Sequence, residues 1–496
     1  MGTFITFPEL LVWLPFLTGI LCFFIKKENT VRQIALFSTL LILAVSVASL
    51  AYTGKEYYAY NNVVYYWLKY LGASLYFGLD GTGKLLTLLT ALAYPLIFAS
   101  SYRKKIKDAS AYYGLMLLCM SGIMGVFVSM DALLFYFFWE LALIPAYFLC
   151  SRWGAERRIQ TTFKFFVYTF AGSLLMLIGI IFVYLHTPAK TFSDGTYVSH
   201  SFVIDSFYQA VLTPNQQNWM FWLFFLAFAI KMPVFPFHTW QPDTYDQSLT
   251  PTTMVLSGIM VKMGLFGVIR WLFPLFPQAS EHFSKIVIIL CVAGMLYASL
   301  LAMVQDNLKK LVAYSSIAHV GLMCAALFAM NEISVKGVMV QMFSHGINII
   351  GMWMIVEFLE RKVNVRKMSE LGGIANKAPV LTIFTVLIVL ANIALPLTNG
   401  FVGEYMMFSG LFIYGKWYAI AGLVCIILAA VYSLRMVRQI FYGETSPAAA
   451  HMTDLGIYEK LVFTIVIVAI FMIGIYPDPF FELTKEAVKI LMLKAI

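Results

Sequence analysis

The sequence predicts an all-α fold, a polytopic membrane bundle of about fourteen transmembrane helices that forms a single integral domain over residues 1–496. Hydrophobic residues make up 61% of the chain and charged residues 12%, and the mean hydropathy is +0.82. A soluble globular protein has about 25% charged residues. The chain also contains many apolar runs that are long enough to cross a hydrocarbon core about 30 Å thick. Composition and run length therefore exclude a soluble globular protein.

The predicted spans are apolar runs separated by polar connections. They fall near residues 8–25, 31–52, 84–102, 113–130, 131–150, 161–185, 218–239, 251–273, 284–304, 311–330, 334–359, 380–411, 417–442 and 461–476. The long connections 53–83 and 186–217 mix aromatic and polar residues, which predicts extramembrane caps. After residue 476, one helical face carries Leu483, Ala487, Ile490 and Leu491. That face predicts a short interfacial helix.

Basic residues concentrate in the connections that follow odd-numbered predicted spans. These residues are Lys26, Lys27, Arg32, Arg103, Lys104, Lys105, Lys107, Arg152, Arg157, Arg158, Lys309, Lys310, Arg361, Lys362, Arg366, Lys367, Arg435 and Arg438. By the positive-inside rule, those connections are cytoplasmic and both termini lie on the non-cytoplasmic side. The net charge of +9 is then explained by topology. We draw no nucleic-acid partner from it.

The stretch 229–246, AIKMPVFPFHTWQPDTYD, predicts a broken helix. Prolines at 233 and 236 interrupt an apolar run that already contains Lys231, and a membrane tolerates such a break only where the freed backbone groups find other partners. Lys231 lies twelve residues after Trp219, which is about 18 Å of helix and near the middle of the bilayer. A buried lysine of this kind usually marks an ion or proton pathway. The alternative is a lysine that snorkels to the interface.

Further ionisable residues stand well inside other predicted spans. They are Glu140, Lys262, His319, His345 and Glu404. Glu404 follows a second break, in which Pro396 and Gly400 interrupt the run 380–411. Each residue alone has a structural explanation, since a histidine can hydrogen-bond a carbonyl and a glutamate can be neutral. Together they are costly, because each unpartnered polar group in an apolar interior costs roughly a few kcal/mol.

Proton transfer is the chemistry that best fits this set. Burial and a nearby opposite charge act in opposite directions on protonation, so making or breaking a Glu140–Lys231 pair would load or unload a proton on Lys231. Lys262 would pass the proton on, His319 and His345 with trapped water would connect, and Glu404 would end the row. Two breaks, each beside an ionisable residue, are expected when a bundle contains two related halves.

Metal and redox cofactors are not predicted in this chain. The histidines inside the spans are more than twenty residues apart and no HExxH motif occurs. The six cysteines are all separate and have no CxxC spacing. No dinucleotide fingerprint follows a soluble strand. We therefore predict no flavin, haem, iron–sulfur cluster or metal.

Four stretches carry a resemblance to a known family: FFWELALIPAYFL from Phe137, KMPVFPFHTWQPD from Lys231, LKKLVAYSSIAHVG from Leu308 and GFVGE from Gly400. Along essentially its whole length the chain resembles the antiporter-like membrane subunits of respiratory complex I, the NADH:quinone oxidoreductase. The resemblance implies two inverted five-helix repeats, at residues 111–275 and 283–442. Helices at 1–110 precede them, a last helix and an interfacial helix at 457–496 follow, and helices 7 and 12 are broken.

The resemblance also implies roles for the ionisable residues. Glu140 and Lys231 form the regulatory pair, Lys262 is the central relay, His319 and His345 connect, and Glu404 is the terminal group. The implied protein lies in the bacterial inner membrane. It translocates protons while quinone is reduced elsewhere in the enzyme. Its implied partners are other membrane-arm subunits, with sister antiporter-like chains on both sides, and the lipid bilayer.

Two alternatives remain. Sister chains, and chains of multisubunit cation/proton antiporters, usually carry lysine where this chain has Glu404. The acid therefore favours one kind of complex I subunit, which is part of a redox enzyme but has no redox chemistry of its own. The alternative is an antiporter subunit. A passive scaffold would leave the buried charges without purpose.

Overall fold

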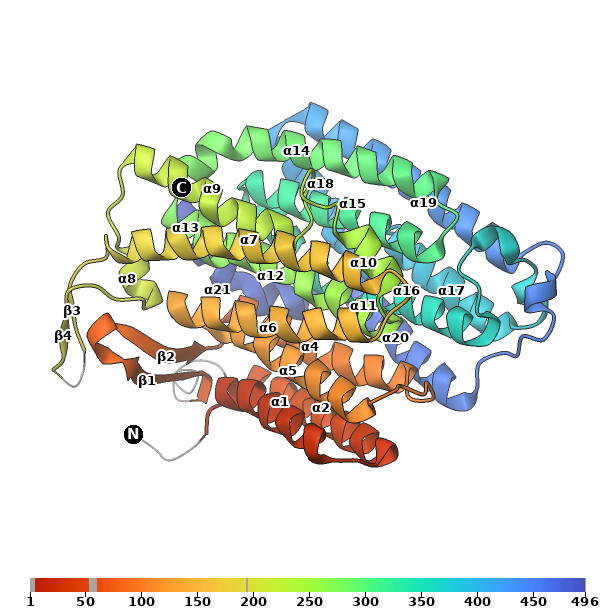
Figure 1. The fold of residues 1–496 in the computed structure, drawn as a ribbon. Helices are drawn as coiled ribbons and strands as arrows, with labels where there is room; N and C mark the ends of the chain where they lie inside the picture. Colours follow the sequence, from red (N-terminus) through yellow and green to blue (C-terminus); the bar gives the residue numbers. More distant parts are fainter. Residues whose placement is uncertain (1–4, 53–59, 193–194, 496) are drawn as a thin grey trace.

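The computed structural model describes residues 5–52, 60–192 and 195–495, and it is a bundle of long, roughly parallel helices (Figure 1). Within these residues, twelve helices are long and apolar enough to cross a membrane. They are α1 (Phe7–Phe24), α2 (Glu28–Leu50), α4 (Gly81–Ser100), α5 (Ala109–Val128), α6 (Ala132–Arg152), α7 (Arg158–Tyr184), the composite span Thr250–Leu275, α14 (Pro277–Val304), α15 (Leu308–Phe328), α16 (Glu332–Val363), α19 (Lys416–Phe441) and α20 (Ile457–Ile475). The predicted all-α membrane bundle is confirmed.

The two remaining predicted spans are interrupted where the prolines stand. α9 (Pro214–Lys231) stops at Lys231, and the chain resumes helical structure at α10 (Gln241–Gln247). α17 (Pro379–Asn392) and α18 (Asn399–Tyr414) leave a similar gap. Both breaks are therefore where the sequence predicts them. The inverted relation of the two repeats and the boundaries 1–110, 111–275, 283–442 and 457–496 stay predictions.

The composite span Thr250–Leu275 is less regular than the single helix predicted there. It consists of α11 (Thr250–Val255), the π-helical segment η2 (Leu256–Met260), α12 (Val261–Gly267), a second π-helical segment η3 (Val268–Leu272) and α13 (Phe273–Leu275). Each π turn holds one residue more than an α turn, and such turns occur frequently at functional sites. Lys262 is the second residue of α12, directly after η2.

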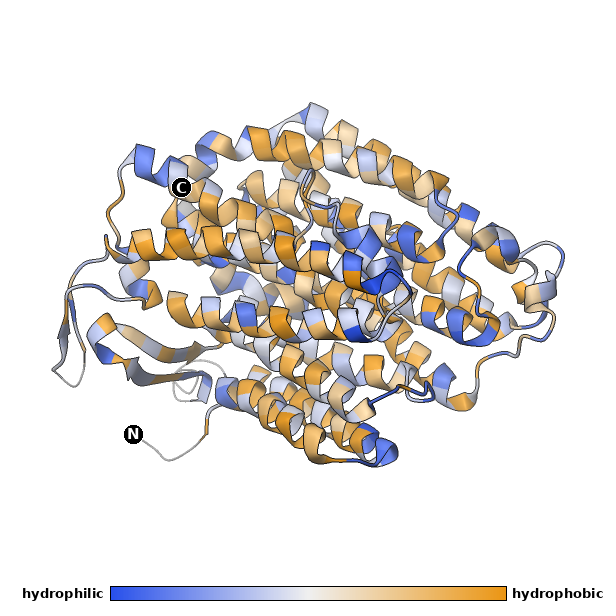
Figure 2. Ribbon diagram, viewed as in Figure 1, coloured by the Kyte–Doolittle hydropathy of each residue, from blue (hydrophilic) through white to orange (hydrophobic). Residues whose placement is uncertain are grey.

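The helices differ in how much of their surface the bundle covers. In the composite span and in α16, every residue of the most apolar stretch is buried, whereas in α1, α2, α7, α19 and α20 only 33–39% of that stretch is buried. The peripheral helices consequently present apolar side chains outward, which the hydropathy colouring shows along their length (Figure 2). Ionisable residues on the central helices are therefore kept away from lipid.

Short elements gather at one end of the bundle (Figure 1). β1 (Asn62–Leu68) and β2 (Ala73–Gly78) form an antiparallel hairpin in which Asn62 pairs with Gly78, and β3 (Lys190–Thr191) pairs with β4 (Tyr197–Val198). α8 (Ile204–Tyr208) lies near them. These elements occupy the predicted caps, of which residues 53–59 and 193–194 lie outside the described residues. The remaining short turns are η1 (Lys69–Leu71), η4 (Met368–Glu370), η5 (Ile374–Asn376) and η6 (Pro447–Ala449).

The C-terminal helix α21 (Asp478–Ala495) packs against α4 and α16. The sequence correctly predicts a helix here, but of the four residues on its predicted apolar face only Leu491 is fully buried, and its interfacial position stays a prediction. Ile490 is 50% exposed, whereas Thr484 and Val488 are buried. The packing of α21 on the bundle, rather than apolar character alone, sets its rotation.

Candidate functional site

Lys262 and His345 form the centre of the candidate site. Lys262 is fully buried, and its Nζ donates to the carbonyl oxygen of Ser257 at 3.3 Å. The same Nζ lies 2.8 Å from Nδ1 of His345, on α16. A charged lysine can only donate, so with Lys262 protonated Nδ1 is the acceptor and the neutral ring carries its proton on Nε2. That Nε2 is buried without a partner among the described residues.

His319, on α15, is the next group in line. Its ring centroid lies 5.6 Å from that of His345. Nδ1 faces the carbonyl oxygen of Ser315 at 2.8 Å, and Nε2 faces the carbonyl oxygen of Asn392 at 3.0 Å. A neutral imidazole has one N–H, so only the protonated ring donates to both carbonyls at once. When the ring is protonated, each of its nitrogens therefore has a carbonyl acceptor.

The break between α17 and α18 supplies part of that environment. Asn392 is the last residue of α17, where the helix stops and its final carbonyls lose their intrahelical donors. One of these freed carbonyls accepts from His319. The amide of Asn392 also donates to the hydroxyl of Ser315 at 3.3 Å, and Tyr432 donates to the same hydroxyl at 3.0 Å. The broken helix thus positions the histidine directly.

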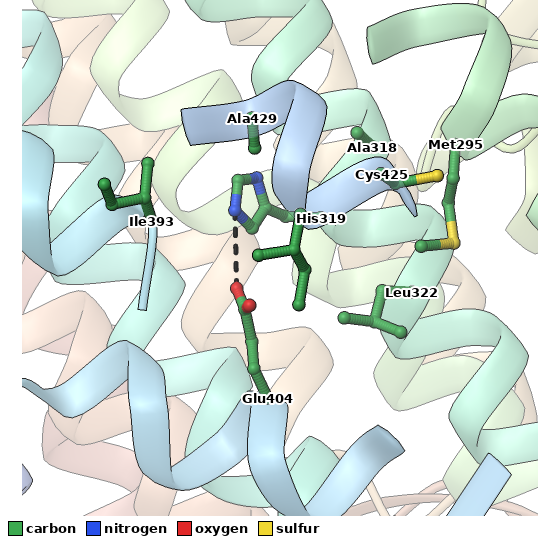
Figure 3. A pocket seen from close by; sticks show the side chains of 9 residues that line it. Met295, Ala318, His319, Leu322, Ile393, Glu404, Cys425 and Ala429 are labelled. Atoms are coloured by element: carbon green, nitrogen blue, oxygen red, sulfur yellow. Dashed lines mark ion pairs between the residues drawn. The ribbon is translucent and has the colours of Figure 1, made fainter. Parts of the chain in front are cut away.

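Glu404, on α18, ends the line. Its Oε1 lies 3.4 Å from Nε2 of His319 and accepts from Nε2 of Gln341 at 3.4 Å. The two ionisable side chains point toward each other across a small cavity whose other walls are apolar (Figure 3). The cavity volume is about 20 Å³, which is enough for a single water molecule.

Lys231 lies apart from this line, at the first break. It is 3% exposed, and its Nζ has no hydrogen-bond partner among the described residues. The ring of Trp139 faces it, with its centroid 5.4 Å from Nζ. The backbone released by the break is satisfied elsewhere, because Trp240 donates its indole N–H to the carbonyl of Ile230 at 3.0 Å.

Glu140 does not contact Lys231 directly. Oε1 of Glu140 and Nζ of Lys231 are both buried without a partner in the part of the chain that the structure describes. Trp139 presents its ring to Lys231, and the next residue on a helix points about 100° away. Glu140 accordingly lies beside Ser173 of α7. The predicted regulatory pair is thus close enough for charge to act through space but is not an ion pair in this structure.

The structure therefore brings four of the six predicted residues into one line: Lys262, His345, His319 and Glu404. Glu140 and Lys231 are not part of it. Sequence reasoning missed Ser315, Gln341, Asn392 and Tyr432, which hold the line in place. The only signal for Asn392 is that an amide side chain stands four residues before the breaking proline.

A second cluster of charges, also missed, joins the connections at the other end of the bundle. Glu357 is nearly fully buried and pairs with Lys104 at 2.9 Å. Glu360 pairs with Lys309 at 3.1 Å and with Arg366 at 3.1 Å. These pairs tie α16 to three connections that the sequence predicts to be cytoplasmic. They explain how so many basic residues are packed together.

No group of three or more His, Cys, Asp or Glu residues that could hold a metal ion occurs among the described residues. The six cysteines are all free and buried. The prediction that the chain carries no redox cofactor stays a prediction.

The family model described as "NADH:quinone oxidoreductase/Mrp antiporter, TM" matches residues 129–430, which include all six predicted site residues. The chain belongs to this family. The membership predicted from the four motifs is confirmed, and the matched region runs from the start of α6 into α19. It contains both breaks and the whole line from Lys262 to Glu404.

Curated members of the NADH:quinone oxidoreductase/Mrp antiporter family match along nearly their whole length. NADH-quinone oxidoreductase subunit M of Rickettsia prowazekii is 32% identical over 492 residues, covering 97% of this chain and 98% of the relative. The subunits M of Pseudomonas aeruginosa and Escherichia coli are 31% and 30% identical, with 96% of each chain covered. The relatives thus carry the name of the subunit type that Glu404 favours.

Solved structures of the same fold extend the likeness in three dimensions. A chain of respiratory complex I from Thermus thermophilus superposes with a TM-score of 0.89 at 24% identity, covering 98% of this chain and 99% of that one. A chain of the Mrp complex from Dietzia superposes with a TM-score of 0.85 at 19% identity, covering 98% and 97%. At these identities the likeness shows the fold alone.

Proposed function

We propose that this chain is a proton-translocating membrane-arm subunit of a bacterial NADH:quinone oxidoreductase. The observation that carries the proposal is the buried line Lys262, His345, His319 and Glu404, in which each group lies within contact or one water of the next. The full-length similarity to curated subunits M supports the choice of enzyme. The chain is then one subunit of that enzyme and takes no part in its redox chemistry.

The geometry supports a defined first step. The ammonium of Lys262 transfers a proton to Nδ1 of His345, which leaves a neutral amine and an imidazolium. The imidazolium then releases the proton from Nε2, the nitrogen that has no partner in the resting arrangement. A proton therefore enters the ring at one nitrogen and leaves from the other.

The following steps carry the proton from His345 through His319 to Glu404. No hydrogen bond joins the two imidazole rings, and Nε2 of His345 has no partner among the described residues, so a water or a ring rotation carries the proton to His319. The two facing carbonyls stabilise His319 once it is protonated. Glu404, 3.4 Å from Nε2, then accepts the proton and becomes a neutral acid. The cavity beside this pair has room for a water molecule that assists the step.

Glu140 and Lys231 act before the line in this proposal. An unpaired ammonium in a buried site is costly, so the charge on Lys231 depends strongly on nearby carboxylate. Glu140 supplies that carboxylate through space. When Glu140 is ionised, Lys231 retains its proton, and when that influence is removed, Lys231 releases the proton toward Lys262.

The distribution of basic residues also bears on the orientation of the chain in the membrane. We propose that the basic connections face the cytoplasm, that both termini lie on the other side of the inner membrane, and that other membrane-arm subunits, including sister antiporter-like chains, flank it. The alternative is a subunit of a multisubunit cation/proton antiporter. The Mrp likeness is consistent with it, but the curated relatives are subunits of the redox enzyme.

The test replaces Lys262 in the assembled complex, reconstituted into vesicles. Lys262→Met keeps the apolar stem but carries no proton, and Lys262→Arg stays protonated. Both should assemble and lose NADH-driven proton pumping by at least about tenfold. Lys336→Met, at a partly exposed lysine that pairs with Glu332 in the first turn of α16, is the matched control and should pump normally. Normal pumping by Lys262→Met would remove the line from the mechanism.

The same vesicles separate the two functions. Proton uptake driven by NADH and quinone supports the redox enzyme. Proton movement that occurs only against a sodium or potassium gradient, and is insensitive to NADH, supports the antiporter.

A further inference from the structure

A basic cavity lies at the ends of α6 and α7, remote from the line of proton carriers. Its volume is about 500 Å³. The connection after α4 contributes Lys104, Lys105 and Lys107 to its wall. The last residue of α6, Arg152, and the first residue of α7, Arg158, also line it. It lies at the end of the bundle where the sequence predicts the cytoplasm.

The cavity carries more positive charge than its own acids neutralise. Lys104 is paired with Glu357, and Arg152 is paired with Asp108 at 2.9 Å. No ion pair involves Lys105, Lys107 or Arg158 among the described residues. Five cations and two anions therefore leave a surplus of three positive charges facing one cavity. Such a surplus attracts an external anion.

The guanidinium of Arg158 is also held in place before any anion binds. Nε of Arg158 donates to the carbonyl of Ser151 at 3.1 Å, and one terminal nitrogen donates to the carbonyl of Ala155 at 3.2 Å. A guanidinium fixed on one side presents its remaining N–H groups in a defined direction, and this geometry suits the oxygens of a phosphate. The side chain loses little further freedom when an anion binds.

A tryptophan braces the wall of the cavity, and the helices beside it carry apolar surface. Trp153 forms part of the wall, and its indole N–H donates to the carbonyl of Lys107 at 2.6 Å. Its ring is buried, so it fixes the connection that carries the lysines. The two helices whose ends line the cavity also carry exposed apolar rows: Ile144 and Phe148 on α6, and Ile159 and Phe163 on α7, each 47–67% exposed.

From these observations we propose that the cavity binds the headgroup of an anionic phospholipid, with its acyl chains along the apolar rows of α6 and α7. Basic pockets between transmembrane helices on the cytoplasmic side recognise such headgroups. A free phosphate would satisfy the surplus charge but would leave the two apolar rows unused. The charge and the apolar rows together select a lipid.

The experiment measures lipid retained by the protein. The assembled complex is reconstituted in nanodiscs that contain equal amounts of phosphatidylglycerol and phosphatidylethanolamine, released, and analysed by native mass spectrometry. We expect phosphatidylglycerol to be enriched on the wild-type protein. The variant Lys105→Gln/Lys107→Gln removes two charges that form no side-chain hydrogen bond or ion pair within the described part of the chain, and each removed charge should lower retention by about fivefold.

The matched control is Lys26→Gln/Lys27→Gln, which removes two exposed lysines from the same end of the bundle but not from the cavity. It should retain the lipid as the wild type does. An equal loss in both double variants would show general attraction to a charged surface and overturn the proposal. Displacement of the lipid by excess inorganic phosphate would show that the cavity takes a soluble anion, and equal retention of both lipids would show no headgroup recognition.

Discussion

The Nζ atom of Lys262 lies 2.8 Å from Nδ1 of His345, although the two residues are 83 positions apart in the chain. The contact joins α12, from one predicted repeat, to α16, from the other. A proton that crosses this contact therefore crosses from one half of the molecule to the other.

Replacing His345 tests that crossing. His345→Gln keeps an oxygen that accepts from Lys262, but an amide does not take up a proton at one atom and release it at another. We expect normal assembly and at least a tenfold loss of pumping. His282→Gln, on an exposed surface of α14, is the matched control and should have no effect. Full pumping by His345→Gln would place the route elsewhere.

Glu404 is expected to require its negative charge. Glu404→Gln retains size and hydrogen bonding but never ionises, so it should assemble and lose at least about tenfold in pumping. Glu404→Lys should be as damaging, because it places a cation 3.4 Å from the site of an imidazolium.

Vesicle pumping at matched complex content measures both variants. Recovery of activity in Glu404→Lys relative to Glu404→Gln would mean that any titratable group suffices. Wild-type coupling in Glu404→Gln would remove the acid from the pathway.

Glu140 should act on Lys231 through charge rather than through a hydrogen bond, because the two side chains do not contact each other. Glu140→Asp keeps the charge and should retain most activity. Glu140→Ala and Glu140→Gln should lose NADH oxidation and pumping together. The control is Glu156→Gln, in the exposed connection after α6. Rescue by glutamine alone would instead indicate a required hydrogen bond.

Gly400 allows α18 to begin close to the end of α17. A Cβ at this position would lie 2.4 Å from the carbonyl oxygen of Ala391, next to the carbonyl that holds His319. Gly400→Ala should therefore displace the break, at a cost of about 1–3 kcal/mol, and reduce pumping in the assembled complex. At Gly456, the nearest atom to an added Cβ is 3.3 Å away, so Gly456→Ala serves as the control. Equal pumping by both variants would separate the break from the proton route.

The sequence predicted much of this arrangement because residues that are energetically unfavourable in a membrane helix can be recognised without coordinates. Prolines at 233, 236 and 396 locate both breaks, and ionisable residues in apolar runs identify the line. By the same criterion Glu357, in the run WMIVEFLE, was also detectable. Its pairing with Lys104 explains why it is structural.

The features that could not be predicted depend on the rotation of each helix about its axis and on the positions of backbone carbonyl groups. The sequence gives the depth of Glu140 but not that Trp139 occupies the side facing Lys231. Backbone acceptors such as the carbonyl of Asn392 leave no mark in side-chain chemistry. The two π-helical segments likewise follow no composition rule.

The π-helical segment η2 has a consequence for comparing this chain with its relatives. Because a π turn accommodates one residue more than an α turn, deleting a single position within 256–260 would restore a regular helix while the residues after it keep their direction. Lys262 would then still face His345. An alignment that places a one-residue gap within this segment accordingly leaves the partner of the lysine unchanged, whereas a one-residue gap in a regular α-helical part of the span would rotate everything after it by about 100°.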